Sequence, residues 1–196
     1  MVNKQKSEVM KKINTYTACL LFAIVFSAIS VCSNSQDTKA DKQSKKEAKK
    51  AQRLADFQSI DTLLNFRTYV LEANYLKNTY GSLIVVASNI NFIRVAGYNG
   101  VLQTGSDSRV GYNSLGGVTA EGSIGNYRIS KDMKNLTHTV TFNLLTNIGN
   151  FDIIMYVSSD FNATATISGS TSGRLTWTGR MVPLNKSRVF KGQNTI

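Results

Sequence analysis

The segment that most constrains the fold is FNATATISGSTSGRLTWTGRM, residues 161–181. Apolar and polar residues alternate along both of its halves, and serine and glycine residues stand between the halves. Because successive side chains of a β-strand point to opposite faces, the pattern predicts a β-hairpin with one apolar and one polar face. Trp177 falls on the apolar face and is expected in the core. The threonines of the polar face suit an exposed sheet surface and need no functional explanation.

Several other segments have strand character from residue 65 onward. Residues 137–146 (THTVTFNLLT) alternate, with His138, Val140, Phe142 and Leu144 on the apolar side. Residues 82–97 begin with a continuous apolar run, which predicts burial on both faces or a bend at 88–91. The dipeptide Asn99-Gly100 predicts a two-residue hairpin turn, since both residues tolerate positive φ.

Strands that follow one another through short turns pair as antiparallel neighbours. About eight of them need a closed barrel or two packed sheets to bury their apolar faces. We therefore predict a mainly β fold, an antiparallel meander that forms a strongly curved sheet or small barrel, with one N-terminal helix packed on it.

The N-terminus has the pattern of an export signal, which we assign to residues 1–35. Basic residues precede an apolar run at 18–30, too short for an ordinary membrane-spanning helix. Two processing sites compete. Cleavage near Ser35 would release a periplasmic or secreted chain, whereas lipidation of Cys32 would give an outer-membrane lipoprotein. Since both cysteines lie within this segment, a disulfide framework is excluded after ordinary cleavage.

After residue 35, a polar segment is followed by a segment rich in helix-forming residues. We predict a polar tether at 36–44 and a lysine-rich amphipathic helix at 45–64, followed by a β-rich domain at 65–184 and a basic C-terminal tail at 185–196. The apolar stripe of the helix consists of Leu54, Phe57, Ile60, Leu63 and Leu64. Its lysines act as a solvated spacer or contact anionic lipid.

The charge is uneven along the chain, which carries 23 basic and 12 acidic residues and a formal net charge of +11. Most of the excess lies before residue 54, so the β-rich domain is only mildly basic. No aromatic residues stand among the lysines, and a stacking platform for single-stranded nucleic acid is therefore absent. We predict no nucleic-acid partner.

The order of motifs resembles an exported Bacteroidetes family, domain of unknown function 4251. The motifs are a lysine-rich helix, then NFIRVAGYNGVLQT, GYNSLGGVTAEG and ISGSTSGRLTWTGRM. The resemblance covers about residues 45–184. It implies export and a compact β-rich domain, and it carries no established activity and no catalytic residues.

The most site-like segment is the glycine-rich loop at 104–122. Its glycines, which include Gly116 and Gly117, allow close approach of the backbone to a ligand. Arg109 and Tyr112 would supply a charged donor and an aromatic face. The alternative is a plain glycine-rich connection at a barrel rim, because the loop lacks the signature of a phosphate-binding loop.

Catalytic and metal-binding patterns are weak. His138 is the only histidine, and no spacing links it to an acid and a nucleophile, so we interpret it as structural. Glu72 and Glu121 lie in expected strands and could face a barrel interior, where a hydrolase would need them at a defined separation. We predict no catalytic residue, no metal and no cofactor.

The sequence therefore favours an exported cell-envelope protein that is not an enzyme. It would bind a small ligand, a glycan or an envelope partner through a barrel mouth or the 104–122 loop. One alternative is a structural or assembly protein of the envelope, and a weaker one is a carboxylate-dependent hydrolase. Membrane association would come from a lipid on Cys32 or from the lysine-rich helix.

Overall fold

The computed structural model describes residues 36–106, 116–169 and 173–195. The expected signal segment with Cys32, and the loop residues Arg109 and Tyr112, lie outside the described residues. The chain divides into two units, residues 1–50 and 51–196, and the second unit contains the strands. No helix within the described ranges is long and apolar enough to cross a membrane.

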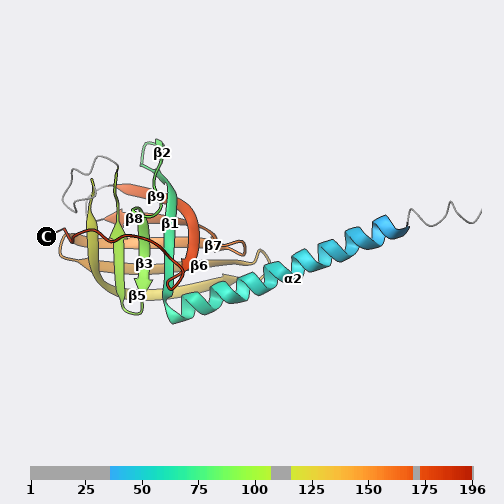
Figure 1. The fold of residues 1–196 in the computed structure, drawn as a ribbon. Coiled ribbons are helices and arrows are strands. Elements are labelled where there is room, and N and C mark those ends of the chain that lie inside the picture. The colour runs from blue at the N-terminus through green and yellow to red at the C-terminus, as the bar shows by residue number, and fades with distance from the viewer. Residues whose placement is uncertain (1–35, 107–115, 170–172, 196) are drawn as a thin grey trace, which may run out of the picture. The chain divides into compact units, whose positions relative to one another are not determined.

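One long helix precedes a run of strands (Figure 1). The helix is α2 (Gln36–Phe66). The strands of the described chain are β1 (Thr68–Lys77), β2 (Leu83–Val85), β3 (Phe92–Ala96), β4 (Asn99–Gln103), β5 (Thr119–Asp132), β6 (Thr137–Thr146), β7 (Gly149–Ser158), β8 (Asn162–Gly169) and β9 (Arg174–Pro183).

The strands form a closed antiparallel barrel. Their order is β2-β1-β3-β4-β5-β6-β7-β8-β9, and β1 also pairs with β9, which closes the sheet on itself. Eight of the described strands make the wall, and the short β2 extends it beside the far end of β1. Figure 1 shows β1 and β9 side by side at this closure. The predicted mainly β fold with one N-terminal helix is confirmed, and the barrel is closed.

The alternating segments occupy the wall as predicted. In β6, partly exposed and buried residues alternate from Thr137 to Leu144, and His138 lies on the buried side. The 161–181 hairpin is present as β8 and β9, paired from Asn162–Arg180 to Ser168–Arg174. Trp177 is fully buried in the main core cluster. The apolar faces of these strands therefore line the barrel interior.

The helix is longer than predicted. Residues 36–44, expected as a tether, belong to α2, where Lys45 donates to Asp41 at 2.9 Å and Gln43 donates to Glu47 at 3.1 Å. Such pairs four residues apart stabilise a helix by a few tenths of a kcal/mol each, about 0.2–0.5 kcal/mol. Apolar spacing alone does not register this polar support, so it predicts a helix that starts too late.

The hairpin turn between β3 and β4 is not at Asn99-Gly100. Ala96 pairs with Asn99, so the turn residues are Gly97 and Tyr98. Gly97 adopts φ +62°, a conformation that glycine reaches without steric cost. Gly100 instead lies buried in β4 against Leu144 and Ile124. The prediction chose the more familiar turn dipeptide and was wrong by two residues.

The 82–97 segment bends, as one of the two alternatives predicted. β2 and β3 are separated by turns that include Ile90, whose N–H donates to the Ala87 carbonyl at 3.3 Å. The other alternative, burial on both faces, is wrong for the apolar run itself. Leu83, Ile84 and Val85 are 63%, 61% and 76% exposed.

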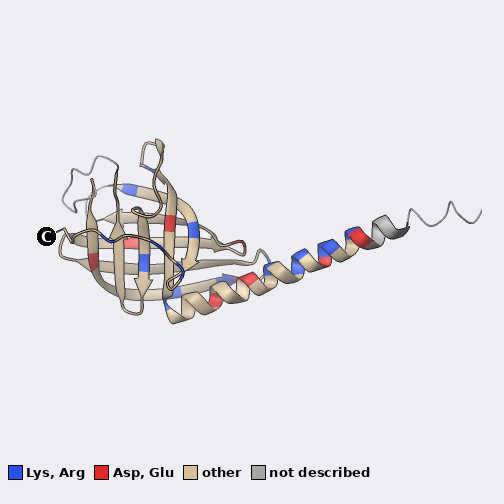
Figure 2. Ribbon diagram, in the orientation of Figure 1, with Lys and Arg blue, Asp and Glu red and all other residues tan. Residues whose placement is uncertain are grey.

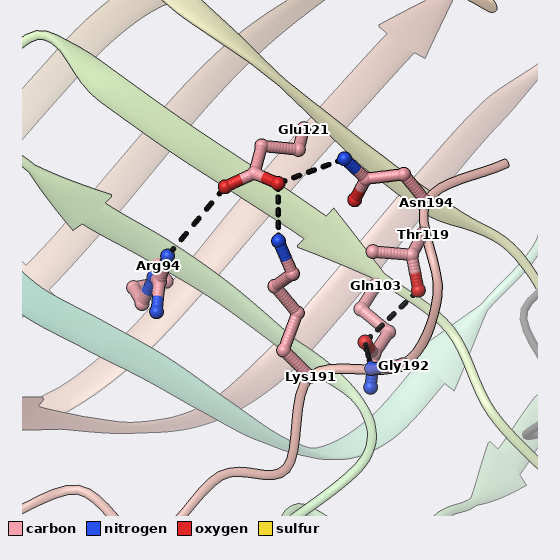
Figure 3. Close-up of polar contacts among 7 residues, drawn as sticks. All are labelled: Arg94, Gln103, Thr119, Glu121, Lys191, Gly192 and Asn194. Carbon is pink, nitrogen blue, oxygen red and sulfur yellow. Dashed lines mark hydrogen bonds and ion pairs between the residues drawn. The ribbon is translucent and has the colours of Figure 1, made fainter. Parts of the chain in front are cut away.

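The C-terminal residues form a strap rather than a free tail. This C-terminal strap, residues 184–195, crosses the outer face of β1, β3, β4 and β5 (Figures 1 and 3). Leu184 and Val189 cover a second apolar cluster of Val70, Phe92 and Val101. Buried Gln103 accepts from the Gly192 N–H at 2.7 Å and donates to the Phe190 carbonyl at 2.8 Å. The outer face on this side of the barrel is therefore covered by the strap through both apolar and polar contacts.

Candidate binding pocket at one end of the barrel

The second half of α2 closes one end of the barrel. Phe57, Ile60 and Leu64 are buried, and Ile60 and Leu64 belong to the interior core cluster. Tyr127 of β5 donates to the Leu64 carbonyl at 2.9 Å. The Arg67 guanidinium, just after the helix, lies 4.4 Å from the ring centre of Tyr127. Apolar burial, a hydrogen bond and a cation–π contact thus fix the helix in this end.

His138 belongs to this closed end. It is fully buried and stacks on Phe57 with ring centres 4.2 Å apart. Its Nε2 lies 3.4 Å from Asp61 Oδ1, long for a hydrogen bond, and the same carboxyl is 2.7 Å from Lys131 Nζ. The single histidine therefore packs the helix against the wall, consistent with the structural role we predicted.

Burial and neighbouring charges shift the pKa values of His138 and Asp61. Burial lowers the pKa of His138, and the opposing effect of the Asp61 carboxylate does not cancel it, so the pKa lies below the ordinary 6.5. Burial raises the pKa of Asp61, but the hydrogen bond and charge of Lys131, aided by His138, outweigh it. The pKa of Asp61 is therefore below its usual range. Neutral His138 is the form that this site stabilises.

The opposite end of the barrel contains a pocket of about 490 Å³. Its walls come from β4, β5, the β6–β7 turn, β7, β8 and β9. The lining residues among those described are Leu102, Thr104, Val118, Ala120, Ile148, Phe151, Ile167, Gly169, Gly173, Leu175 and Trp177. This set, called the open-end pocket below, contains one hydroxyl side chain and no charged side chain.

The floor and the rim of the open-end pocket differ in burial. Trp177, Ala120 and Ile167 are buried and form the floor, whereas Phe151 and Leu175 at the rim are partly exposed. The Trp177 indole N–H is buried and has no hydrogen-bond acceptor among the described residues. The pocket therefore resembles ordinary small-molecule sites, which are concave, mostly apolar and about 300–1,000 Å³.

A second, polar cleft of about 590 Å³ adjoins the pocket. We call it the cationic cleft. Its described lining residues are Lys77, Asn78, Thr79, Ser168, Gly169, Gly173, Arg174 and Thr176. It shares Gly169 and Gly173 with the open-end pocket. Figure 2 shows that Lys and Arg residues are dense on the first part of α2 and sparse on the barrel strands, so two cations in one cleft are a local concentration.

The loop that the sequence marked as site-like borders the open-end pocket through its two ends. Thr104 and Val118 line the pocket, and the Thr104 N–H donates to the Val118 carbonyl at 2.9 Å. A Cβ on Gly117 would lie 2.3 Å from the Thr104 carbonyl oxygen, so this close approach requires glycine. Gly116 lines a smaller neighbouring cleft of about 260 Å³. Arg109 and Tyr112 belong to the part of the loop outside the described ranges.

Glu72 and Glu121 do not face the barrel interior. Both lie on the outer face beneath the C-terminal strap, where Ser187 donates to Glu72 at 2.7 Å. Figure 3 shows Glu121 contacted by Lys191, Asn194 at 2.9 Å and Arg94 at 3.8 Å. β3 and β4 separate their strands, which places their backbones about 14 Å apart at ordinary strand spacing. The weaker alternative of an interior carboxylate pair is therefore wrong, since a glycosidase pair needs about 5–9 Å.

The surroundings of Glu121 explain its charge state. Hydrogen bonds from Lys191 and Asn194 lower the pKa of this carboxyl against the opposing effect of partial burial. The residue therefore serves as an anionic anchor for the C-terminal strap. No cluster of three or more potential metal ligands occurs among the residues that the structure describes.

Comparison with known proteins gives the family. The chain matches DUF4251, a domain of unknown function, over residues 50–181. This chain belongs to the DUF4251 family. It is similar to a DUF4251 family protein from Bacteroides eggerthii DSM 20697, whose crystal structure was determined at 1.95 Å resolution. The two are 29% identical with a TM-score of 0.59, over 69% of this chain and 93% of that one. No curated protein matches the chain.

The family match confirms the resemblance drawn from the motifs, and its range agrees with the helix-plus-barrel unit. The match ends at residue 181 and so leaves out the C-terminal strap. DUF4251 carries no described activity, and the pocket must therefore be interpreted from its own residues.

Proposed function

We propose that this DUF4251 protein is a non-catalytic binding module of the cell envelope that holds a small, largely apolar ligand in the open-end pocket. The main observation behind this proposal is that the two ends of the barrel have different contents. Helix side chains fill one end, whereas the other contains a pocket of about 490 Å³ with buried apolar residues at its floor. Buried apolar contact contributes about 25 cal/mol per Å², so such a pocket favours a ligand with an apolar body.

Direct binding of a fluorescent apolar probe tests this function. Trp177 is the only tryptophan in the chain and lies at the pocket floor, so it reports on occupancy. Titration with N-phenyl-1-naphthylamine is expected to quench Trp177 emission and enhance probe emission at one saturable site. Failure of the wild-type protein to bind this probe and a panel of fatty acids and alcohols would contradict the proposal.

Variants that fill the pocket identify where the probe binds. Ala120→Phe places a ring at the floor, and Val118→Phe does so nearer the rim, in case the first variant folds poorly. Either is expected to weaken probe binding at least tenfold. Leu145→Phe, on an exposed residue of β6, is the matched control and should bind as the wild type does.

Export is part of the proposal, and mass spectrometry tests it. The basic and apolar pattern of residues 1–35 supports transport out of the cytoplasm. The intact mass of the protein from its native host would begin at Gln36 after ordinary cleavage. A lipid-modified Cys32 would instead indicate membrane attachment, and an unprocessed Met1 would contradict export through this segment.

A structural or assembly role is the second candidate, and β2 supports it. This strand lies at the sheet edge and exposes Leu83, Ile84 and Val85. Exposed apolar edge strands pair readily with another chain. Sedimentation of the purified protein tests self-association through β2. A dimer lost in Ile84→Lys would favour assembly, whereas a monomer at all concentrations would count against it.

A further inference from the structure

We propose that the ligand is amphipathic and anionic, with an apolar body in the open-end pocket and an acidic group in the cationic cleft. This inference rests on the proposed function and names the chemical class of its ligand. It is carried by the contact between two clefts of opposite character, which share Gly169 and Gly173.

The cationic cleft has the composition of an anion site. Lys77 and Arg174 supply positive charge, and the other described lining residues are small, hydroxyl-bearing or amide-bearing. No carboxylate is among them, and neither cation forms an ion pair with a described residue. The other four basic residues of the barrel wall are Arg94, Arg128, Lys131 and Arg180, and two of these, Arg94 and Lys131, lie near carboxylates. Lys77 and Arg174 are therefore available to an external anion.

The strand pairing holds the two cations beside the pocket. Lys77 pairs with Thr176 across the closure of the barrel, and the adjacent pair is Leu76 with Trp177, which lies at the pocket floor. Thr79 fixes the backbone of Arg174 through two hydrogen bonds, at 3.0 and 3.1 Å. Consecutive residues of β9 thus contribute to the two clefts in turn, since Arg174 and Thr176 line the cationic cleft and Leu175 and Trp177 line the open-end pocket.

Two glycines stand where the clefts meet. Gly169 and Gly173 line both clefts and carry no side chain. Among the described atoms, a Cβ on Gly173 would meet nothing within 4 Å, whereas a Cβ on Gly169 would meet the Phe151 ring at 3.5 Å. A flexible chain leaving the apolar pocket can cross at these residues and place its acidic end near Lys77 and Arg174. A carboxylate or phosphate is the chemistry that Lys and Arg recognise.

Matched ligands that differ only in the head group test this inference. Dodecanoate, dodecanol and dodecyltrimethylammonium share one chain length, and each is titrated against the wild-type protein with Trp177 emission as the readout. Dodecanoate is expected to bind about fivefold or more tighter than dodecanol, because two exposed cations contribute modestly in water. The cationic ligand should bind most weakly.

Removing the two cations should abolish the preference for the acid. The double variant Lys77→Gln/Arg174→Gln is expected to bind dodecanoate and dodecanol within about twofold of each other and to leave dodecanol affinity unchanged. The double variant Arg128→Gln/Lys134→Gln removes the same charge from exposed residues elsewhere and should retain the preference. This control separates a local contact from the overall charge of the protein.

The outcomes distinguish the two proposals. Equal binding of dodecanoate and dodecanol by the wild type overturns the anionic head group and leaves the apolar pocket standing. Loss of preference in both double variants overturns the assignment to Lys77 and Arg174. If no dodecyl ligand and no naphthylamine probe binds, the binding function itself fails. If the wild type does prefer dodecanoate to dodecanol, a comparison with dodecyl phosphate decides whether a carboxylate or a phosphate fits the cationic cleft better.

Discussion

The two ends of the barrel have similar apolar walls and different contents. At one end, Phe57, Ile60 and Leu64 of the helix occupy the interior, and Tyr127 hydrogen-bonds to the helix backbone. At the other end, Trp177 and its neighbours border a pocket of about 490 Å³. The chain thus supplies its own apolar filling for one end only.

This difference separates stability from binding in one small fold. The helix-filled end contributes buried area and polar contacts, so changes there should alter the free energy of unfolding. The open end leaves rim residues such as Leu175 exposed, so changes there should alter ligand affinity more than stability. Four predictions test this division, in decreasing order of expected effect.

Truncation should be far more costly at the helix-filled end. Leu64→Ala removes a fully buried side chain and is expected to lower the free energy of unfolding by about 3 kcal/mol. Leu175→Ala, on a rim residue that is 40% exposed, should lower it by less than about 1 kcal/mol. Urea unfolding followed by circular dichroism measures both. Equal losses would mean that the two ends do not differ as described.

Ligand should stabilise the protein only through the open end. At a free probe concentration ten times its Kd, N-phenyl-1-naphthylamine should add about 1.4 kcal/mol to the free energy of unfolding. The Ala120→Phe variant should show no such gain, and Leu145→Phe should show the full one. Thermal unfolding with and without probe checks this. A gain that persists in Ala120→Phe would place the probe elsewhere.

The hydrogen bond to the helix can be removed without changing shape. Tyr127→Phe leaves the Leu64 carbonyl without its side-chain donor and should cost about 1 kcal/mol. Tyr156→Phe, on a residue that is more than half exposed, is the control and should cost nothing measurable. Probe affinity should be unchanged in both. A large loss of affinity in Tyr127→Phe would couple the two ends.

The smallest expected effect is a pH dependence at the helix-filled end. Burial lowers the pKa of His138, so the unfolded chain takes up the proton first as pH falls. Stability is therefore present above the unfolded value of 6.5 and declines as pH falls below it towards the folded pKa. The melting temperature should be lower at pH 5 than at pH 7.5, and His138→Phe should reduce this difference. An unchanged slope in the variant would assign the effect to other groups.

The sequence predicted which residues share a strand face better than it predicted which segment covers that face. Alternation placed Trp177 and His138 on buried sides, and both are buried. The same alternation did not say which side of β1 and β5 is interior, because Val70 and Glu72 form an outer row that the distant C-terminal strap covers. A residue can be buried on either side of a wall when another segment lies over it.

The candidate site was only partly predictable. The ends of the 104–122 loop do line the open-end pocket, which a glycine-rich loop between strands suggested. The remaining walls come from four other strands and one turn, and no local pattern joins them. The antiparallel order puts Leu102 of β4 and Leu175 of β9 at the same edge of the sheet, and only barrel closure brings them together across the interior. The cations Lys77 and Arg174 were likewise unremarkable until β1 and β9 became neighbours.

The pairing of β1 with β9 also fixes the stage of folding at which the barrel can close. The first strand of the barrel is completed by the last, so neither the wall nor the pocket can exist until residue 183 has become available. Contacts between such distant segments form slowly, because the chain loses the entropy of closing a long loop before the contacts add stability. A chain that is synthesised or exported with its N-terminus first would have an open sheet, and could not hold ligand, until its last strand is available.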